Sequence, residues 1–297
     1  MISVLRDAGL SALIDPASDL ERIADGFEFT EGPLWQPDGA LLFQDIKAER
    51  TYRLDDHGRL GVLREHTRAA NGQTFAPDGK IVFCEQNGRR VSRMDADGGR
   101  VETLVEAFEG KRLNSPNDIV CRGDGLIYFT DPAYGAPPDR PMDYQGVYVM
   151  DPDGANMRLL VADFEKPNGL AFSPDERTLH ICDTGRYHVR SFAVLESGQI
   201  QRDSGRVFCT LDPGVPGGPD GMKVDRSGRL YIAVALGVWV FEPGGRLLGI
   251  LSTPKRPSNL AWCGPDANVL AITMIDEVVR VRLKTRGVSP PFTPKSD

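Results

Sequence analysis

Six segments of this chain repeat one pattern, in which a polar residue is followed by a short, mainly apolar run and then by a turn. Successive segments start 40, 46, 51, 52 and 39 residues apart, which is mostly the length of one propeller blade, roughly 40–50 residues. Asn168-Gly169 alone is an ordinary turn dipeptide, and it gains meaning as one of six equivalents. The six first residues are Glu31, Asn71, Asn117, Asn168, Asp220 and Asn259.

Each segment continues with an alternating apolar stretch, such as residues 80–84, and then with a further strand-like stretch, such as residues 90–94. Short strands with turns at regular spacing are typical of all-β proteins. No long amphipathic helical pattern is present. Four strands repeated six times predict a six-bladed β-propeller of four-stranded blades.

The sixth unit ends after about residues 280–283 and lacks a fourth strand. Residues 19–27 precede the first unit and are expected to supply that strand, which would remove an exposed sheet edge. The propeller would then be closed by its N-terminal strand. We therefore predict one domain spanning residues 1–297, with no interior linker.

Composition excludes several classes of partner. The formal net charge is −7, which argues against nucleic acid, because phosphate binding needs a basic face. No basic tract exceeds three residues, so binding to an anionic membrane is not expected. The first residues lack the basic and long apolar regions of a signal peptide, so the expected location is the cytoplasm. Buried free thiols are expected at Cys84, Cys121, Cys182, Cys209 and Cys263.

The first residue of each repeat has a particular place in a propeller. If the repeated stretch is the innermost strand of its blade, that residue lies at one end of the central channel. All six side chains carry oxygen, two are carboxylates, and none is a thiol or an imidazole. Hard oxygen ligands favour Ca²⁺ or Mg²⁺, and Ca²⁺ tolerates irregular coordination better. Asn71 and Asn259 are expected to line the channel without reaching the cation.

Four motifs carry a resemblance to a known family. They are Glu31-Gly-Pro-x-Trp35, Leu113-Asn-Ser-Pro-Asn117-Asp, Pro167-Asn168-Gly-Leu and Gly218-Pro-Asp220-Gly. In this order, and with all six repeats, they resemble the SMP-30/gluconolactonase/LRE family of six-bladed, metal-dependent lactonases. The resemblance implies a small lactone substrate, such as gluconolactone, and metal ligands at Glu31, Asn168 and Asp220.

The resemblance also implies that Asn117 is a further metal ligand or a substrate contact. Some members have an Arg two residues earlier, where this chain has Ser115. Arg112 lies nearby and is a candidate substrate contact. The expected cofactor is Ca²⁺, with Zn²⁺, Mg²⁺ and Mn²⁺ as alternatives.

The resemblance further implies a mechanism in which the cation polarises the lactone carbonyl. Asp220 is then the candidate general base, because the matching Asp of the family has that role. A metal-bound Asp has a lowered proton affinity, so the alternative is that the cation alone activates the water and Asp220 is only a ligand.

Loops at the same end of the channel are expected to set specificity. The longest spans residues 131–146 and carries Tyr134, and its prolines make it a shaped wall. Asp183 and Arg186 lie in the corresponding loop of the fourth unit. These three residues are candidate substrate contacts, although loop charges are more often only solvated.

Two other functions remain open from the sequence. Related propellers use the same metal to hydrolyse organophosphates, so a phosphotriesterase-like activity is one alternative. A non-catalytic binding propeller is the other, and converging carboxylates and amides argue against it. Fold alone does not decide function.

Overall fold

A computed structural model describes residues 2–288 and residue 290 of the chain. Residue 1, residue 289 and residues 291–297 of the predicted domain lie outside the described residues. The described part is almost entirely β-structure, and its one helix is the short 3-10 helix η1 (Leu10–Leu13). It contains no helix long and apolar enough to cross a lipid bilayer.

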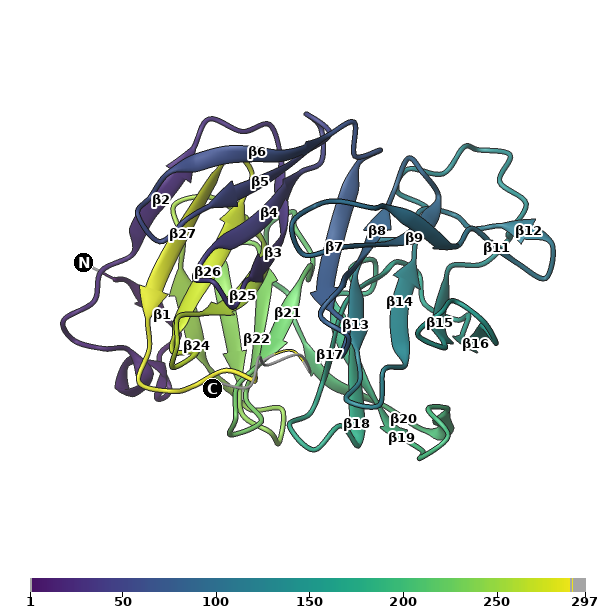
Figure 1. Cartoon of the computed structure of the whole chain (residues 1–297). Helices are drawn as coiled ribbons and strands as arrows, with labels where there is room; N and C mark the ends of the chain where they lie inside the picture. Colours follow the sequence, from purple (N-terminus) through teal and green to yellow (C-terminus); the bar gives the residue numbers. More distant parts are fainter. Residues whose placement is uncertain (1, 289, 291–297) are drawn as a thin grey trace.

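Six antiparallel sheets of four or five strands form the blades of a propeller (Figure 1). The first strand of each blade contacts the first strands of the two neighbouring blades, which closes the ring. The predicted all-β, six-bladed propeller is therefore confirmed.

The strands of blades 1 to 3 are β3 (Thr30–Trp35), β4 (Leu41–Asp45), β5 (Arg50–Leu54), β6 (Leu60–Glu65), β7 (Ala70–Phe75), β8 (Ile81–Glu85), β9 (Arg90–Met94), β10 (Glu102–Val105), β13 (Ile119–Cys121), β14 (Ile127–Asp131), β15 (Gly146–Met150) and β16 (Arg158–Val161). The strands of blades 4 to 6 are β17 (Pro167–Phe172), β18 (Thr178–Asp183), β19 (His188–Val194), β20 (Ile200–Thr210), β21 (Met222–Val224), β22 (Leu230–Val234), β23 (Gly237–Phe241), β24 (Leu247–Ser252), β25 (Pro257–Cys263), β26 (Val269–Met274), β27 (Glu277–Arg282) and β2 (Glu21–Asp25). A small hairpin outside the blades consists of β11 (Ala107–Phe108) and β12 (Lys111–Arg112).

The N-terminal segment closes the ring. Strand β2 pairs with β27 and completes blade 6, and Arg280 Nε donates to Glu21 Oε2 at 2.7 Å across this pair. The prediction that residues 19–27 supply the missing strand is confirmed. A further strand that the sequence pattern did not predict, β1 (Val4–Leu5), pairs with β24 and gives blade 5 a fifth strand.

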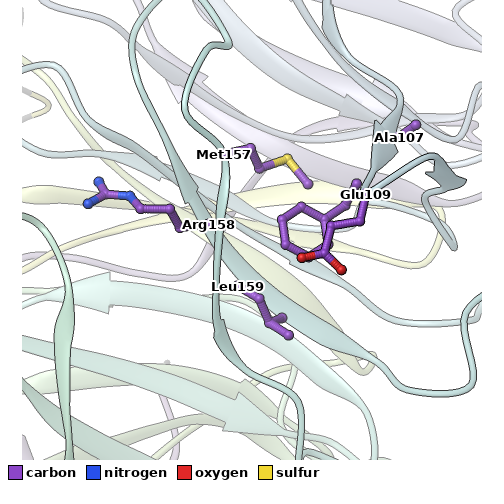
Figure 2. Close-up of a pocket in the computed structure, with 6 residues that line it drawn as sticks. Ala107, Glu109, Met157, Arg158 and Leu159 are labelled. Atoms are coloured by element: carbon purple, nitrogen blue, oxygen red, sulfur yellow. The ribbon is translucent and has the colours of Figure 1, made fainter.

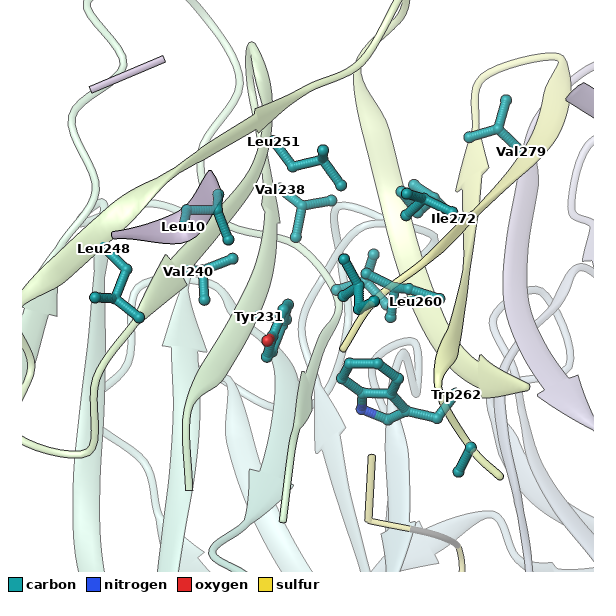
Figure 3. Close-up of a cluster of buried hydrophobic side chains, with 14 of the residues drawn as sticks. Leu10, Tyr231, Val238, Val240, Leu248, Leu251, Leu260, Trp262, Ile272 and Val279 are labelled. Carbon is teal, nitrogen blue, oxygen red and sulfur yellow. The ribbon is translucent and has the colours of Figure 1, made fainter. Parts of the chain in front are cut away.

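Apolar side chains fill the spaces between neighbouring blades, because alternate residues of each strand face alternate sides of its sheet. In the cluster between blades 5 and 6, Tyr231 and Trp262 meet edge to face with ring centroids 5.1 Å apart (Figure 3). Leu10 of η1 packs into the same cluster. All five cysteines are buried and free, as the sequence predicts.

The first strand of a blade departs from regular pairing at the polar residue of the repeat. In β3, Glu31 lies opposite Gln44 and Leu34 lies opposite Leu42. The two residues of β3 between these pairs therefore face a single residue of β4. The same shift in register occurs in β7 and β17. A bulge of this kind bends the strand and re-aims a side chain.

Glycine follows the polar residue in four of the six repeats, and close packing explains it. A Cβ atom on Gly169 would lie 2.3 Å from Asp220 O, and one on Gly32 would lie 2.1 Å from Asn71 O. Neighbouring innermost strands thus approach so closely that only glycine fits without a shift. Asn168 and Gly169 lie inside β17 and not in a turn, although the dipeptide is common in turns.

Replacing Gly169 by Ala is expected to lower the free energy of unfolding by about 1–3 kcal/mol, because the added methyl group overpacks a backbone contact. Denaturant unfolding of the purified variant measures this change. Gly61→Ala is the matched control, since no atom lies within 4 Å of a Cβ at that position of β6. Equal stability of the two variants would contradict the close approach of the innermost strands.

Candidate active site

The six polar residues of the repeats are all buried at the start of the innermost strands, with exposed fractions of 3–8%. They also meet across blades. Asn259 of blade 6 donates from Nδ2 to Glu31 Oε2 of blade 1 at 3.0 Å. Between blades 2 and 3, Gly72 N donates to Asn117 O at 2.9 Å. These contacts bring Glu31 and Asn259 together and place Asn117 beside the residue that follows Asn71, on innermost strands that contact one another around the ring.

Glu31 is held by two donors on a single oxygen. Gly32 N donates to Oε2 at 2.8 Å, and Asn259 Nδ2 donates to the same atom. Among the described residues both hydrogen bonds to this carboxylate go to Oε2, so Oε1 is the oxygen available to a cation. Burial raises the pKa of Glu31 well above its usual range, and the nearby charges of Asp220 and Asp118 raise it further.

Asn168 and Asp220 are each oriented by neighbours. Asn168 donates from Nδ2 to Thr184 Oγ1 at 3.1 Å and to Tyr134 OH at 3.4 Å, which directs its amide oxygen away from them. Arg256 donates from a guanidinium nitrogen to Asp220 Oδ2 at 3.2 Å. Burial raises the pKa of Asp220 to about 6, an effect that Arg256 and Asn168 oppose.

Asp118 is a site residue that the sequence analysis missed. Its side chain is buried, Oδ1 accepts a bond from Ile119 N at 2.9 Å, and Oδ2 has no hydrogen-bond partner among the described residues. Burial raises the pKa of Asp118, whereas Lys223 and Asn259 oppose this. One signal could have identified it, because Asp118 stands where four of the other repeats have glycine.

The protein balances the charges of this cluster only in part. Asp118 and Asp220 both raise the pKa of Glu31, and Asp118 raises the pKa of Asp220. Partly buried Lys223 and the guanidinium of Arg256 supply two positive charges beside three buried carboxylates, so one negative charge remains without a counter-charge. Leaving a buried charge unpaired is costly. The orphaned Asp118 Oδ2 and the hard oxygen donors suit a cation such as Ca²⁺.

The residues present also limit how such a cation is held. Among the described residues, no three His, Cys, Asp or Glu side chains are grouped so that they alone could hold a metal ion. A cation at this end of the channel therefore needs amide oxygens as well, and Asn117 and Asn168 are the amides of the predicted set.

Tyr134 lies beside the ring, as its loop position suggests. Its hydroxyl is 3.4 Å from Asn168 Nδ2, and its side chain is partly exposed. Ser115 accepts a hydrogen bond on Oγ from Gly135 N at 3.0 Å and so anchors the loop next to this tyrosine. Lys166 Nζ lies 5.8 Å from the centre of the Tyr134 ring.

Asp183 has a structural role instead of the predicted substrate contact. It is fully buried, and its oxygens accept backbone N–H groups of Glu165, Lys166 and Gly185 at 2.9–3.1 Å. With its acceptors occupied in this way, the side chain is directed toward the backbone that leads into β17 and toward the start of its own loop.

The two arginines that were predicted to contact substrate also donate hydrogen bonds to nearby backbone carbonyl groups. Arg186 donates to Asp163 O at 2.6 Å, and Arg112 donates to Gly88 O at 2.9 Å. The structure does not bring either guanidinium into contact with the ring. Arg256 is the guanidinium that does reach it, and it directly precedes β25, where the last repeat begins.

Two hollows on the described surface lie apart from the ring. One of about 490 Å³ lies between blades 1 and 6, with Trp35, His57 and Arg280 among its lining residues. The other, of about 540 Å³, is lined by residues of the hairpin strand β11, of β16 and beside them, namely Ala107, Phe108, Glu109, Met157, Arg158 and Leu159 (Figure 2). Neither hollow contains a residue of the predicted site.

Comparison with known sequences identifies the family. The model of the SMP-30/Gluconolactonase/LRE-like region matches residues 29–276, which include all six polar positions. The chain belongs to this family. The resemblance seen in the four motifs is therefore confirmed.

Individual relatives agree with this assignment. The gluconolactonase of Zymomonas mobilis is 32% identical over 94% of this chain and 85% of its own length. The structure of a gluconolactonase from Xanthomonas campestris superposes with a TM-score of 0.86 at 34% identity, covering 95% of both chains. The calcium-binding protein regucalcin from Agrobacterium tumefaciens has a TM-score of 0.78 over 92% of this chain and 97% of its own, and at 19% identity it shares the fold.

Replacing Glu31 by Gln is expected to stabilise the metal-free protein, because it removes one of three mutually repelling buried carboxylates. A rise in Tm of about 2–4 °C corresponds to roughly 1 kcal/mol in a protein of this kind. In the wild-type protein Ca²⁺ is expected to raise the Tm, and the same change should abolish this rise. Thermal unfolding in EDTA and in Ca²⁺ measures both effects.

The control for this experiment is Glu196→Gln, which removes an exposed carboxylate. It should leave the Tm in EDTA and the response to Ca²⁺ unchanged. A Glu31→Gln protein that is less stable in EDTA and still responds to Ca²⁺ would show that Glu31 belongs to no repelling cluster and holds no cation.

Proposed function

We propose that this chain is a lactonase that opens small lactones, with aldonolactones such as gluconolactone as the expected substrates. The observation that supports this most is the ring of oxygen donors at the channel end, with buried carboxylates at Glu31, Asp118 and Asp220. The ring occurs in a chain that is similar to gluconolactonases over nearly its whole length. A binding platform would gain nothing from burying this charge.

The cation of this site is proposed to be Ca²⁺, held by Glu31, Asn117, Asn168 and Asp220. Carboxylate and amide oxygens in irregular arrangement suit Ca²⁺ better than Mg²⁺, which demands near-ideal octahedral geometry. When bound, the cation would supply a Lewis acid for the lactone carbonyl. Asp118 adds negative charge beside these ligands, and we include it in the site.

Asp220 is proposed as the general base. Burial raises the pKa of Asp220 to about 6 in the protein without a cation, and a bound cation would lower it. Asp220 is therefore ionised at neutral pH and can accept a proton. Arg256 holds Oδ2, so Oδ1 can accept a proton from the attacking water as the water oxygen bonds to the carbonyl carbon. Cleavage of the bond from that carbon to the ring oxygen, with transfer of the same proton from Asp220 to the ring oxygen, releases a hydroxy acid and restores the carboxylate.

Tyr134 is proposed to contact the substrate. Its hydroxyl accepts a hydrogen bond from Asn168 Nδ2, and its partly exposed ring offers an apolar face at the channel end. A sugar lactone presents both hydroxyl groups and C–H faces, so it can use both parts of this side chain. Arg112, Asp183 and Arg186 are not included in this proposal.

The expected activity is hydrolysis of aldonolactones that is lost in EDTA and restored by Ca²⁺. A panel of aldonolactones and one organophosphate, assayed with EDTA and with Ca²⁺, Mg²⁺, Mn²⁺ or Zn²⁺ added back, measures it. Turnover of the organophosphate alone would favour a phosphotriesterase. No metal-dependent turnover of any compound would rule out the proposed enzyme.

Replacing Asp220 by Asn tests the role of the base. If Asp220 accepts the proton, kcat should fall by roughly 10²–10⁴-fold while Ca²⁺ still binds, because an amide oxygen can remain a ligand. Calorimetric Ca²⁺ titration and steady-state kinetics on the same preparation separate binding from turnover. Asp212→Asn, at an exposed position, is the control and should retain both. A parallel loss of binding and turnover in Asp220→Asn would make Asp220 a ligand only.

A further inference from the structure

One buried aspartate recurs in three blades with the same contacts. Asp45, Asp131 and Asp183 end the second strands β4, β14 and β18, and their exposed fractions are 0–1%. Each accepts two successive backbone N–H groups, the first on Oδ2 and the second on Oδ1. We call these three residues the aspartate clamps.

The contacts are nearly identical in length. Asp131 accepts Asn114 N at 2.8 Å and Ser115 N at 2.7 Å. The other clamps have distances of 2.9 Å on Oδ2 and 3.0 Å on Oδ1, from Glu28 N and Phe29 N to Asp45 and from Glu165 N and Lys166 N to Asp183. Bonds from N–H groups to a buried carboxylate are strong and directional.

The N–H groups that bond to the clamps stand at the same sequence distance from the polar residue in all three blades. In each case they lie three and two residues before the polar residue of the same blade, so the clamp fixes the backbone that leads into it. The polar residues concerned are Glu31, Asn117 and Asn168. These are three of the four residues proposed to hold the cation.

Among the described residues, the blades whose polar residue is expected only to line the channel have no such clamp. In blade 2 the equivalent position is Glu85, which pairs with the guanidinium of Arg90. A backbone contact, Gln86 N to Ala69 O at 3.0 Å, is present here as in the clamped blade 1, where Ile46 N donates to Phe29 O at 3.0 Å. The difference is therefore the bonds to a carboxylate. In blade 6 the second strand ends at an apolar residue, Met274.

The fourth proposed ligand is fixed in another way. In blade 5 the second strand ends at Val234, which cannot accept a hydrogen bond through its side chain. Here Arg256 holds the Asp220 carboxylate directly at 3.2 Å. Each proposed ligand is thus associated with a carboxylate clamp or with Arg256, whereas Asn259 of blade 6 contacts Glu31 and Lys223 directly.

We propose that Asp45, Asp131 and Asp183 are positioning residues for the cation site, and that each fixes the backbone before one ligand in three of the four ligand blades. This rests on the proposed function, because it concerns the same cation. A carboxylate that fixes the backbone before a ligand lowers the cost of ordering that ligand when the cation binds. Partners of this kind commonly contribute 10–100-fold to metal affinity.

The test is calorimetric titration of Ca²⁺ into EDTA-treated protein, with Asp131→Asn as the principal variant. Asn has nearly the same shape, but it sets an NH₂ group against one of the two backbone N–H donors. The Kd for Ca²⁺ is expected to rise 10–100-fold. Asp45→Asn, in another blade, should have the same effect and provides an independent variant if Asp131→Asn does not fold.

Two controls separate positioning from stability. Glu85→Gln changes the equivalent buried residue of blade 2. Asp225→Asn changes a fully buried aspartate of blade 5 that accepts Ser227 N at 2.9 Å and Arg229 N at 3.0 Å, in the turn after β21. Both should lower Tm while the Kd for Ca²⁺ stays within about threefold of the wild-type value, since neither fixes the backbone before a ligand.

The outcomes distinguish the inference from the proposed function. If the wild-type protein binds Ca²⁺ and the folded clamp variants bind it equally well, the clamps are structural and the inference is overturned alone. A loss of affinity in the controls equal to that in the clamp variants would overturn it as well. If the wild-type protein binds none of Ca²⁺, Mg²⁺, Mn²⁺ and Zn²⁺, the proposed cation site and the inference are rejected together.

Discussion

The close approach of neighbouring innermost strands is the constraint on which the rest of this structure depends. A Cβ atom on Gly32 or Gly169 would lie only 2.1–2.3 Å from a backbone oxygen of the next blade. This approach brings six polar side chains to one channel end, so that Asn259 can reach Glu31 across the junction of the last and first blades. That junction is itself completed by β2, which pairs with β27. The junction that closes the ring therefore also brings residues of the site together.

Gathering these side chains has an energetic cost that the fold must offset. Glu31, Asp118 and Asp220 are buried near one another, and burial raises the pKa of each. Charges arranged in this way destabilise a protein unless a counter-charge is present. Lys223 and Arg256 supply part of it, and a divalent cation is the simplest source of the remainder. The extensive apolar packing between blades, such as the contact of Tyr231 with Trp262, supplies the stability that this arrangement requires.

The sequence predicted the features that repeat. Six polar positions in register, the propeller and the closing strand β2 all follow from periodicity, since each unit must be paired in the same way. The motifs that carry Glu31, Asn168 and Asp220 also indicated the family. Asp118 was missed because it breaks the repeat, occupying a position where four of the other units have glycine.

Residues that act between units were harder to predict. Arg256 contacts Asp220 across 36 positions of the chain, and no local pattern indicates such a contact. Asp183 was a candidate substrate contact because its loop lies at the end of the channel, yet backbone N–H groups bond to its carboxylate. The orientation of a side chain depends on which donors the fold places around it, and only the three-dimensional structure contains that information.

We propose that one divalent cation binds among Glu31, Asn117, Asn168 and Asp220. An anomalous difference map from crystals soaked in Mn²⁺ marks the position of the ion and tests this most directly. We expect a single strong peak at the channel end, within coordinating distance of oxygens from all four side chains. A peak at another place, or one coordinated by Asn71 and Asn259 in place of Asn117 and Asn168, would contradict it.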